Sequence, residues 1–393
     1  MGFGAIIASG EKNKILRDDL VDCLTEVRVE QFLDDPTRFA IRFQEDLSNG
    51  EPMIMNAEEL QCEQMITIAV QVGDELKCLV RGPITDVKCS LKLGGPGSWY
   101  EIHGQDRRVE LDRECVYHRW DGLASAAAEE ILKKKFKTVV AATRKTYGGS
   151  KVQGKPTAGT LNQRWTDLAF LRRITRQNNL HFWLKYDCRL DPMDQFRQSL
   201  KVDETANLKP SPPRPKDAPA GPVPVEQIEL ASTVPIKLRV NVDKAQCPNV
   251  TTFEISTNGE RPNQFAGCTI DERDARKHRT SAADPQPAIH KGRRQAPGCK
   301  APRDLCITTA GNQEDLHRKA EAALTEAGWF VNAKASTTAH MLGGVLIPHE
   351  VVEVEGLGSV HSGPYQVKAV THVINAANHF MDIQLRRNAM GGG

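Results

Sequence analysis

The sequence has no apolar run of the roughly 18–20 residues that a membrane-spanning helix requires. Its first residues also lack a basic segment followed by a long apolar core, so we expect no signal peptide and a protein made in the cytoplasm. Charge of one sign does not dominate either, because 52 basic and 50 acidic residues leave a formal net charge of +2. We therefore expect neither membrane insertion nor a basic protein that coats nucleic acid.

Motifs of the common enzyme classes are missing. There is no GxSxG nucleophile elbow, no HExxH helix and no phosphate-binding loop ending in GK[ST]. The glycines at 94–97 precede a predicted strand, so a hairpin turn explains them better than a phosphate cradle, which needs a following helix. The acidic pairs Asp34–Asp35 and Glu45–Asp46 lie at strand ends, where solvated turns account for them. The sequence predicts no catalytic residue, no cofactor and no enzymatic activity.

The ten cysteines include no CxxC pair, the usual spacing of a zinc knuckle or a redox motif. We expect reduced thiols, as is usual for a protein made in the cytoplasm. The alternative is a metal clip in one loop-rich segment that contains Cys247, Cys268, Cys299, Cys306, His278 and His290. These gaps are long and irregular, so we expect no metal site. His372 and His379 have no acidic or Cys partner at ligand spacing, which favours histidines bonded to the backbone.

The first 120 residues have the pattern of short β-strands. Phe39, Ile41 and Phe43 alternate with polar residues, which is typical of a strand with one buried face. Further strands are predicted at 66–72, 76–80, 84–93 and 99–103. Strands at this spacing predict a small barrel or sandwich.

The middle of the chain is predicted to be α+β. An Ala-, Glu- and Lys-rich segment predicts a helix at 123–139. A second helix is predicted at 166–177, because Leu168, Leu171 and Ile174 form one apolar stripe. The chain then alternates as a strand over 180–186.

Beyond residue 205 the pattern changes again. The segment 209–224 is rich in proline, which predicts an extended linker. Strands are predicted at 235–242 and 250–256, and the basic, polar segment 271–303 predicts a long exposed loop. A helix at 316–327 is followed by strands at 345–347 and 351–354 and by a hairpin of 365–374 with 381–385.

Two segments resemble signature stretches of the phage late control D family, the baseplate hub proteins of contractile tails. The same module forms the N-terminal base of type VI secretion spike proteins. The resemblance rests on one set in the middle of the chain and one near its end: Asp167, Phe170, Leu171, Arg172, Arg173, Ile174, Phe182 and Trp183, then Gly363, Tyr365, Val367, Val370, His372, Arg386 and Arg387. Gly82, Ile84, Gly104 and Asp106 also resemble the G-x-I and G-x-D positions of the family's first barrel.

This resemblance implies an α+β, predominantly β protein with two small β-barrels and an α+β middle region. Three copies would close into a pseudo-hexameric ring that adapts a six-fold tail tube to a three-fold spike. It implies a first barrel at 1–120, a middle domain at 121–205, a linker at 206–224, a connecting domain at 225–330 that contains the loop 271–303, and a second barrel at 331–393.

The expected function is that of a structural, non-enzymatic hub in an assembled contractile particle, a virion or an injection-system baseplate. Its expected partners are itself as a homotrimer, the spike protein, the inner tube or its initiator, and baseplate wedge proteins. We also expect the edge of the 365–374 hairpin to be buried in the ring. The alternatives are a hub-associated cell-wall-degrading enzyme or metal-binding tail component, and an adaptor that binds phosphate through 271–303.

Overall fold

The computed structural model of the 393-residue chain describes residues 4–45, 52–73, 75–92, 97–121, 124–141, 150–152, 155–157, 160–191, 194, 198–210, 236–241, 247–262, 264–270, 277–282, 304–307, 313–388 and 390–391. Of the predicted linker 206–224, the part beyond residue 210 lies outside the described residues.

The N-terminal part consists of antiparallel strands joined by short helical turns. Its elements are β1 (Ala5–Ser9), β2 (Lys14–Ile15), α1 (Asp18–Asp22), β3 (Leu24–Phe32), β4 (Arg38–Glu45), the 3-10 turn η1 (Glu58–Leu60), β5 (Met65–Val72), β6 (Glu75–Ser90), β7 (Ser98–Gln105) and the 3-10 turn η2 (Arg107–Asp112). The alternation in β4 buries Phe39, Ile41 and Phe43, which confirms the predicted strand with one buried face. The two strands predicted at 76–80 and 84–93 are one long strand, β6, which pairs first with β5 and then with β7.

The middle part combines two helices with a long hairpin. Its elements are β8 (His118–Asp121), α2 (Ala124–Lys135), β9 (Thr138–Ala141), β10 (Ser150–Val152), β11 (Lys155–Thr157), β12 (Thr160–Gln163), α3 (Asp167–Gln177), β13 (His181–Leu190) and β14 (Leu200–Lys209). The helix predicted at 123–139 ends at Lys135. Its predicted last residues form strand β9, which runs parallel to β14, so strand pairing overrides the helical pattern there. The helix predicted at 166–177 and the strand after it are confirmed as α3 and β13.

The C-terminal part is a second group of strands with α4 beside it. Its elements are β15 (Lys237–Arg239), β16 (Thr252–Thr257), β17 (Gln264–Ile270), β18 (Lys277–Ala282), β19 (Asp304–Ile307), α4 (Gln313–Ala327), β20 (Val331–Thr338), α5 (Ala339–Leu342), β21 (Val351–Glu355), α6 (Gly358–His361), β22 (Gly363–Ile374) and β23 (His379–Arg387). The predicted hairpin is confirmed as β22–β23.

Two predictions for this part differ from the structure. Residues 277–282 of the predicted loop form strand β18, which pairs with β17, while 271–276 and 283–303 lie outside the described residues. The strand predicted at 345–347 is irregular chain.

One continuous sheet connects all three parts. Its main path runs β16-β20-β23-β22-β3-β4-β7-β6-β13-β14-β9. Residues 369–374 of β22 pair with 27–32 of β3, so the C-terminal and N-terminal strands are directly hydrogen-bonded. Among the described strands this path ends at β16 and β9 and does not close into a barrel, which differs from the two separate barrels that we expected.

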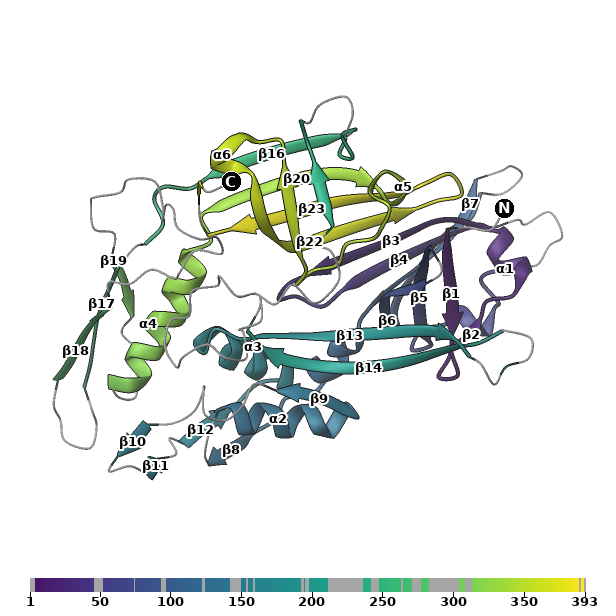
Figure 1. Ribbon diagram of the computed structural model, residues 1–393. Coiled ribbons are helices and arrows are strands. Elements are labelled where there is room, and N and C mark those ends of the chain that lie inside the picture. Colours follow the sequence, from purple (N-terminus) through teal and green to yellow (C-terminus); the bar gives the residue numbers. More distant parts are fainter. Residues whose placement is uncertain are drawn as a thin grey trace.

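We expected the edge of the 365–374 hairpin to be buried by a neighbouring subunit of the ring, but the structure covers it within the same chain. β22 is already paired with β23 on one side and with β3 and β21 on the other, so its edges are covered within the same chain. Figure 1 shows the yellow C-terminal strands lying against the purple N-terminal strands, with the teal β13–β14 hairpin below them.

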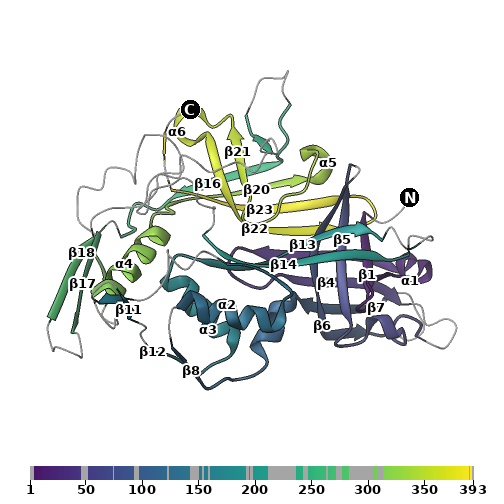
Figure 2. The same ribbon diagram turned by 60° about the horizontal axis from the view of Figure 1, so that its bottom comes forward.

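The hydrophobic cores join the N-terminal and C-terminal parts and separate the middle part from them. One large core contains residues from both the N-terminal and the C-terminal strands, including Ile41, Ile102, Val354 and Ile383. A separate core joins α2 and α3 to the β13–β14 hairpin through residues such as Phe170. In Figure 2 these two helices lie across one face of that hairpin. The N-terminal and C-terminal strands therefore fold as one body, with the middle part attached to it.

Candidate functional site: the junction of the three parts

Helix α3 begins at a well-formed cap. Thr166 accepts a hydrogen bond from the Ala169 N–H at 3.2 Å. The carboxylate of Asp167 accepts one from the Gln163 side chain at 2.6 Å, and Gln163 in turn accepts one from the indole N–H of Trp120 at 2.8 Å. Asp167 therefore fixes the start of the helix on strands β8 and β12.

The apolar residues of the middle motif are core residues. Phe170, Leu171 and Ile174 are at most 1% exposed and pack in the core of the middle part. Phe182 of β13 belongs to the same core and lies near the ring of Phe136. These four positions stabilise the middle part and present no surface to a ligand.

The two arginines of the motif have different roles. Arg172 forms an ion pair of 2.9 Å with Asp35, which lies in the turn between β3 and β4. Arg173 stays within the middle part, with its guanidinium 5.1 Å from the ring centre of Trp165 and a hydrogen bond to the Asn162 carbonyl. Arg172 therefore connects the middle part to the N-terminal strands.

A cluster of aromatic side chains joins all three parts. His181 of β13 pairs with Asp34 at 2.5 Å, and its ring lies 6.0 Å from that of His349 in the C-terminal part. Trp183 stacks on His349 with 3.8 Å between ring centres. Burial tends to raise the pKa of Asp34, but the hydrogen bond from His181 and nearby positive charges lower it on balance. Burial holds the pKa of His349 well below its ordinary value, so this histidine is neutral near pH 7.

Arg108 provides a second connection. Its guanidinium pairs with Asp106 at 2.7 Å, donates to the Phe182 carbonyl of β13 at 3.0 Å and donates to the Asp35 carbonyl at 2.8 Å. The side chains of Arg108 and Asp106 are 3% and 1% exposed. Asp106 also accepts the Thr37 N–H at 2.7 Å. This buried ion pair holds the β3–β4 turn, the end of β7 and β13 together.

Two glycines allow the strands beneath this pair to approach closely. A Cβ on Gly82 would lie 1.8 Å from the Gln105 carbonyl oxygen, and one on Gly104 would lie 2.1 Å from the Phe39 ring. Gly82, Gly104 and Asp106 are the G-x-I and G-x-D positions noted in the sequence. The structure gives them a physical reason, which is the close contact of β6 and β7 next to the Asp106–Arg108 pair.

The C-terminal motif builds a second cluster around two buried arginines. Arg386 bonds to Gln366 at 2.8 Å and to Glu326 at 3.1 Å, and its guanidinium lies 4.1 Å from the ring centre of Trp329. Arg387 donates to the carbonyls of His361 and Ser362.

The other residues of this motif lie beside the arginines or in the core. Arg387 lies over the ring of Tyr365, whose hydroxyl donates to the His361 carbonyl at 2.8 Å. Gly363 has a φ of 125°, which favours glycine, and Val367 and Val370 lie in the large core. The motif therefore fixes the 358–363 turn onto β22 and β23.

His372 differs from its prediction. It is fully buried and bonds to two side chains, Gln31 of β3 at 3.1 Å and His379 of β23 at 3.0 Å, rather than to the backbone. Burial lowers the pKa of His372 well below its ordinary value and that of His379 to about 4.

The two predicted sets of residues do not form one cluster. The middle part is linked to the rest of the chain by Asp106, which the sequence motif includes, and by residues outside the two predicted sets: Asp34, Asp35, Arg108, His181 and His349. Asp34 and Asp35 were expected in a solvated turn, yet both pair with the middle part. Glu45 is also buried, because it accepts the N–H groups of Ile54 and Met55, while Asp46 lies outside the described residues.

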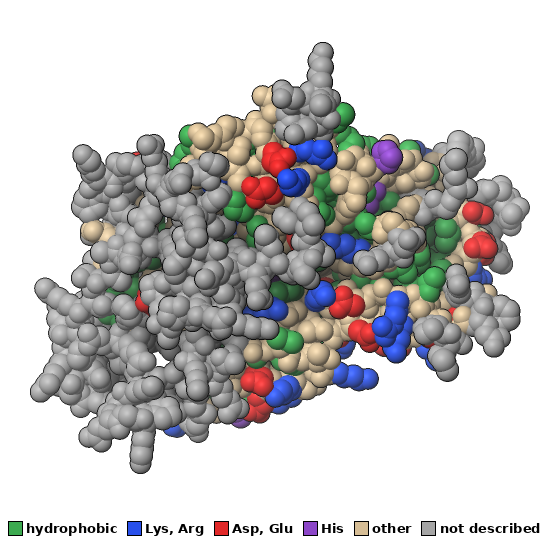
Figure 3. Space-filling view, viewed as in Figure 1, with side chains coloured by type: hydrophobic (Ala, Val, Ile, Leu, Met, Phe, Trp, Pro, Cys, Tyr) green, Lys and Arg blue, Asp and Glu red, His purple; other side chains and the backbone are tan. Residues whose placement is uncertain are grey.

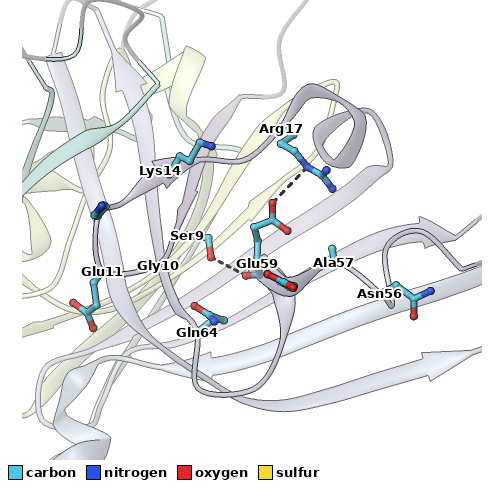
Figure 4. A pocket seen from close by; sticks show the side chains of 11 residues that line it. Ser9, Gly10, Glu11, Lys14, Arg17, Asn56, Ala57, Glu59 and Gln64 are labelled. Atoms are coloured by element: carbon cyan, nitrogen blue, oxygen red, sulfur yellow. Dashed lines mark hydrogen bonds and ion pairs between the residues drawn. The ribbon is translucent and has the colours of Figure 1, made fainter.

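A surface pocket of about 610 Å³ lies elsewhere, between the β1–β2 turn and η1. Figure 4 shows its polar lining, in which the Ser9 hydroxyl donates to the Glu59 carbonyl and Arg17 pairs with Glu59. Its lining contains no His or Cys, and the hydrogen bond of the Ser9 hydroxyl goes to a backbone carbonyl and not to a side-chain base.

Neither a metal centre nor a membrane helix is found in the described part of the chain. No group of three His, Cys, Asp or Glu side chains is placed to hold a metal there, and no helix there is long and apolar enough to span a bilayer. The side chains of Cys268, His278 and Cys306, and all of His290 and Cys299, lie outside the described residues. On the face seen in Figure 3, basic and acidic side chains alternate over the described surface.

The sequence matches no protein-family model and no curated protein. Solved structures share its fold. A tail protein from Neisseria meningitidis is 13% identical with a TM-score of 0.62, and the match covers 98% of this chain and 97% of that one. A 43 kDa tail protein of prophage MuSo2 from Shewanella oneidensis is 12% identical with a TM-score of 0.62, covering 98% and 99%. An Escherichia coli component of the type VI secretion system is 12% identical with a TM-score of 0.51, covering 94% and 76%.

These matches establish the fold of the chain over almost its whole length. It is the predominantly β fold of phage tail proteins and of a type VI secretion component.

Proposed function

We propose that this chain is a structural hub subunit of a contractile injection system and has no enzymatic activity. The observation that carries the proposal is the match to tail proteins over nearly the full length of both chains. This match includes all three parts of the chain.

The junction gives the proposed role a physical basis. A hub transmits force during contraction, so its parts must not move independently. The β3–β22 strand pairing and the buried Arg108–Asp106 pair connect the parts by directional hydrogen bonds within packed cores.

In the proposed assembly three copies close into a pseudo-hexameric ring between a six-fold tube and a three-fold spike. Among the described strands, β16 pairs only with β20 and β9 only with β14, so each has one edge without a partner strand. Free edges invite association with another chain, and we assign the covering of these edges to neighbouring subunits. The spike and the inner tube are the proposed main partners, with baseplate wedge proteins as further ones.

Deleting the gene in a strain that produces the particle tests this function. The hub role predicts that tubes, sheaths and spikes then fail to assemble into sedimenting particles, and that the wild-type gene restores them. Complete particles that have lost only cell-wall cleavage would instead support the enzyme alternative and overturn the proposal.

A further inference from the structure

The charge of the chain is distributed unevenly between its parts. Residues 1–112 contain 12 basic and 21 acidic residues, a net charge of −9, whereas residues 113–209 contain 19 basic and 10 acidic residues, a net charge of +9. The overall net charge of +2 hides this separation. An acidic N-terminal part and a basic middle part attract each other, within one chain and between copies of it.

Part of this attraction is used inside the chain. At the junction Arg172 pairs with Asp35 and His181 pairs with Asp34, so the middle part already contacts the acidic N-terminal part there. Both contacts are made to the turn between β3 and β4. Charged residues that lie farther from this turn are left to interact with another molecule.

The basic residues of the middle part gather where helix α2 ends and strand β9 begins. Lys133, Lys134 and Lys135 form the last turn of α2, Lys137 precedes β9, and all four are exposed. Lys133 and Lys134 pair with glutamates one turn earlier in the helix, whereas Lys135 and Lys137 have no ion-pair partner among the described residues. Val140 of β9 is 43% exposed, and β9 pairs with β14 alone among the described strands. We call these five residues the α2–β9 surface.

An acidic region lies on the N-terminal part, where helix α1 and the turn η1 come together. The Arg17–Glu59 ion pair joins the start of α1 to η1. Residues 11–22 and 58–63 contain seven acidic and three basic residues. The region is therefore acidic overall, although some of its carboxylates are paired within it.

Two carboxylates of this region are exposed without a partner. Asp18 of α1 and Glu58 of η1 form no ion pair with any described residue. Met53 and Met55 lie shortly before η1 and are each 40% exposed, so flexible apolar side chains accompany the charges. We call these four residues the α1–η1 surface. It has the opposite charge to the α2–β9 surface and, like it, includes exposed apolar side chains.

We propose that the α2–β9 surface of one copy of the chain docks on the α1–η1 surface of the next copy. The inference rests on the proposed function, because it names the surfaces that meet in the proposed ring. Figures 1 and 2 both show α1 well away from α2, so the two surfaces of one copy face different neighbours. A contact between two different surfaces is heterologous, and its repetition closes a ring where the rotation allows it.

The two kinds of side chain have different effects in this contact. Val140 and the two methionines are removed from water, which supplies the apolar centre that a stable interface needs. The lysines and carboxylates around them set the orientation of the copies and speed their encounter. The contact also covers the edge of β9 that no described strand pairs with.

Sedimentation velocity of the full-length chain over a range of concentrations tests the contact. Exposed charges are screened by salt, so self-association should weaken between about 0.05 M and about 0.5 M NaCl. The double variant Lys135→Glu, Lys137→Glu should raise the dissociation constant at least about tenfold at the lower salt concentration, because it sets like charges against each other.

A charge swap makes the test specific for these two surfaces. Adding Asp18→Lys and Glu58→Lys to that double variant restores opposite charges across the contact and the net charge of the wild type. The dissociation constant should then return to within about threefold of the wild-type value. A fourfold variant that associates no better than the double variant would overturn the proposal.

The control reverses two lysines outside both surfaces. Lys88→Glu, Lys185→Glu makes the same change in net charge at residues that are each 55% exposed, and it should leave association unchanged. If the variant with Lys135 and Lys137 reversed fails to fold, Asp18→Lys, Glu58→Lys alone should weaken association to the same extent. Trimers that neither salt nor any reversal affects would overturn this contact but leave the hub function standing. A wild-type chain that stays monomeric would remove the ring and the contact together.

Discussion

At the scale of single residues, Arg108 contributes most directly to the junction. It contacts Asp106, the Phe182 carbonyl and the Asp35 carbonyl while almost completely buried. Its removal leaves the buried Asp106 carboxylate without its positive partner and takes one donor from each carbonyl.

We predict that Arg108→Met lowers the free energy of unfolding by about 3–5 kcal/mol, the usual loss when one partner of a buried ion pair is removed. Urea denaturation measures this. Arg189→Met is the matched control, because the Arg189–Asp203 pair is 59% and 58% exposed, and it should cost no more than about 1 kcal/mol. Equal losses in both variants would show that the buried Arg108–Asp106 pair contributes no more to stability than the exposed Arg189–Asp203 pair.

Gly82 lies in the same region, where its lack of a side chain allows β6 and β7 to approach closely. We predict that Gly82→Ala lowers the free energy of unfolding by about 3 kcal/mol or more, because the added Cβ meets the Gln105 carbonyl. Gly259→Ala, whose Cβ would have no neighbour within 4 Å, should change it by less than about 0.5 kcal/mol. The same denaturation experiment checks both, and a neutral Gly82→Ala would contradict the close strand contact.

At the scale of elements, the sequence predicts local structure well where one apolar pattern dominates. Helix α3 is predictable because its stripe of Leu168, Leu171 and Ile174 is amphipathic and its cap residue is Thr166. Strand β20 is missed because its buried positions include Ala333 and Ala335, small residues with little strand preference, and pairing with β16 and β23 supplies the strand.

The junction was less predictable than its elements. Asp34, His181 and His349 are separated by more than a hundred residues each and carry no spacing that joins them in the sequence. Only the β3–β22 pairing and the docking of β13 bring them together. The motif resemblance locates α3, β13 and the β22–β23 hairpin, but not the contacts among them.

The pairing of β22 with β3 and β23 also predicts a dependence on pH. His372 and His379 have pKa values below the ordinary 6.5, His379 at about 4, so the unfolded chain binds protons that the folded chain does not. Their contribution to the stability of the fold is complete above about pH 6.5. As the pH falls from 6.5 toward 4, the equilibrium constant for folding decreases by up to about tenfold per pH unit for each histidine.

The midpoint of urea unfolding between pH 7 and pH 5 measures this effect. The double variant His372→Gln, His379→Gln should have a smaller slope than wild type, while His340→Gln, at an exposed position, should keep the wild-type slope. An unchanged slope in the double variant would mean that these histidines bind protons equally well in the folded chain.

At the scale of the whole molecule, the proposed ring requires that free strand edges be covered by other subunits. Ile255 lies on β16 and is 37% exposed. We predict that Ile255→Lys weakens self-association at least tenfold, because a lysine on an edge strand discourages pairing with another chain. Met341→Lys, at a similarly exposed apolar residue of helix α5, should leave association unchanged. Sedimentation velocity over a range of concentrations compares the two, and equal behaviour would remove β16 from the interface.

The mass of the purified chain in solution, measured by light scattering with and without its candidate spike protein, tests the central claim most directly. The hub account predicts a particle of three 43.5 kDa chains that gains the mass of one spike trimer when the spike is added. A chain that stays at 43.5 kDa at every concentration and whose mass the spike does not change would contradict the account.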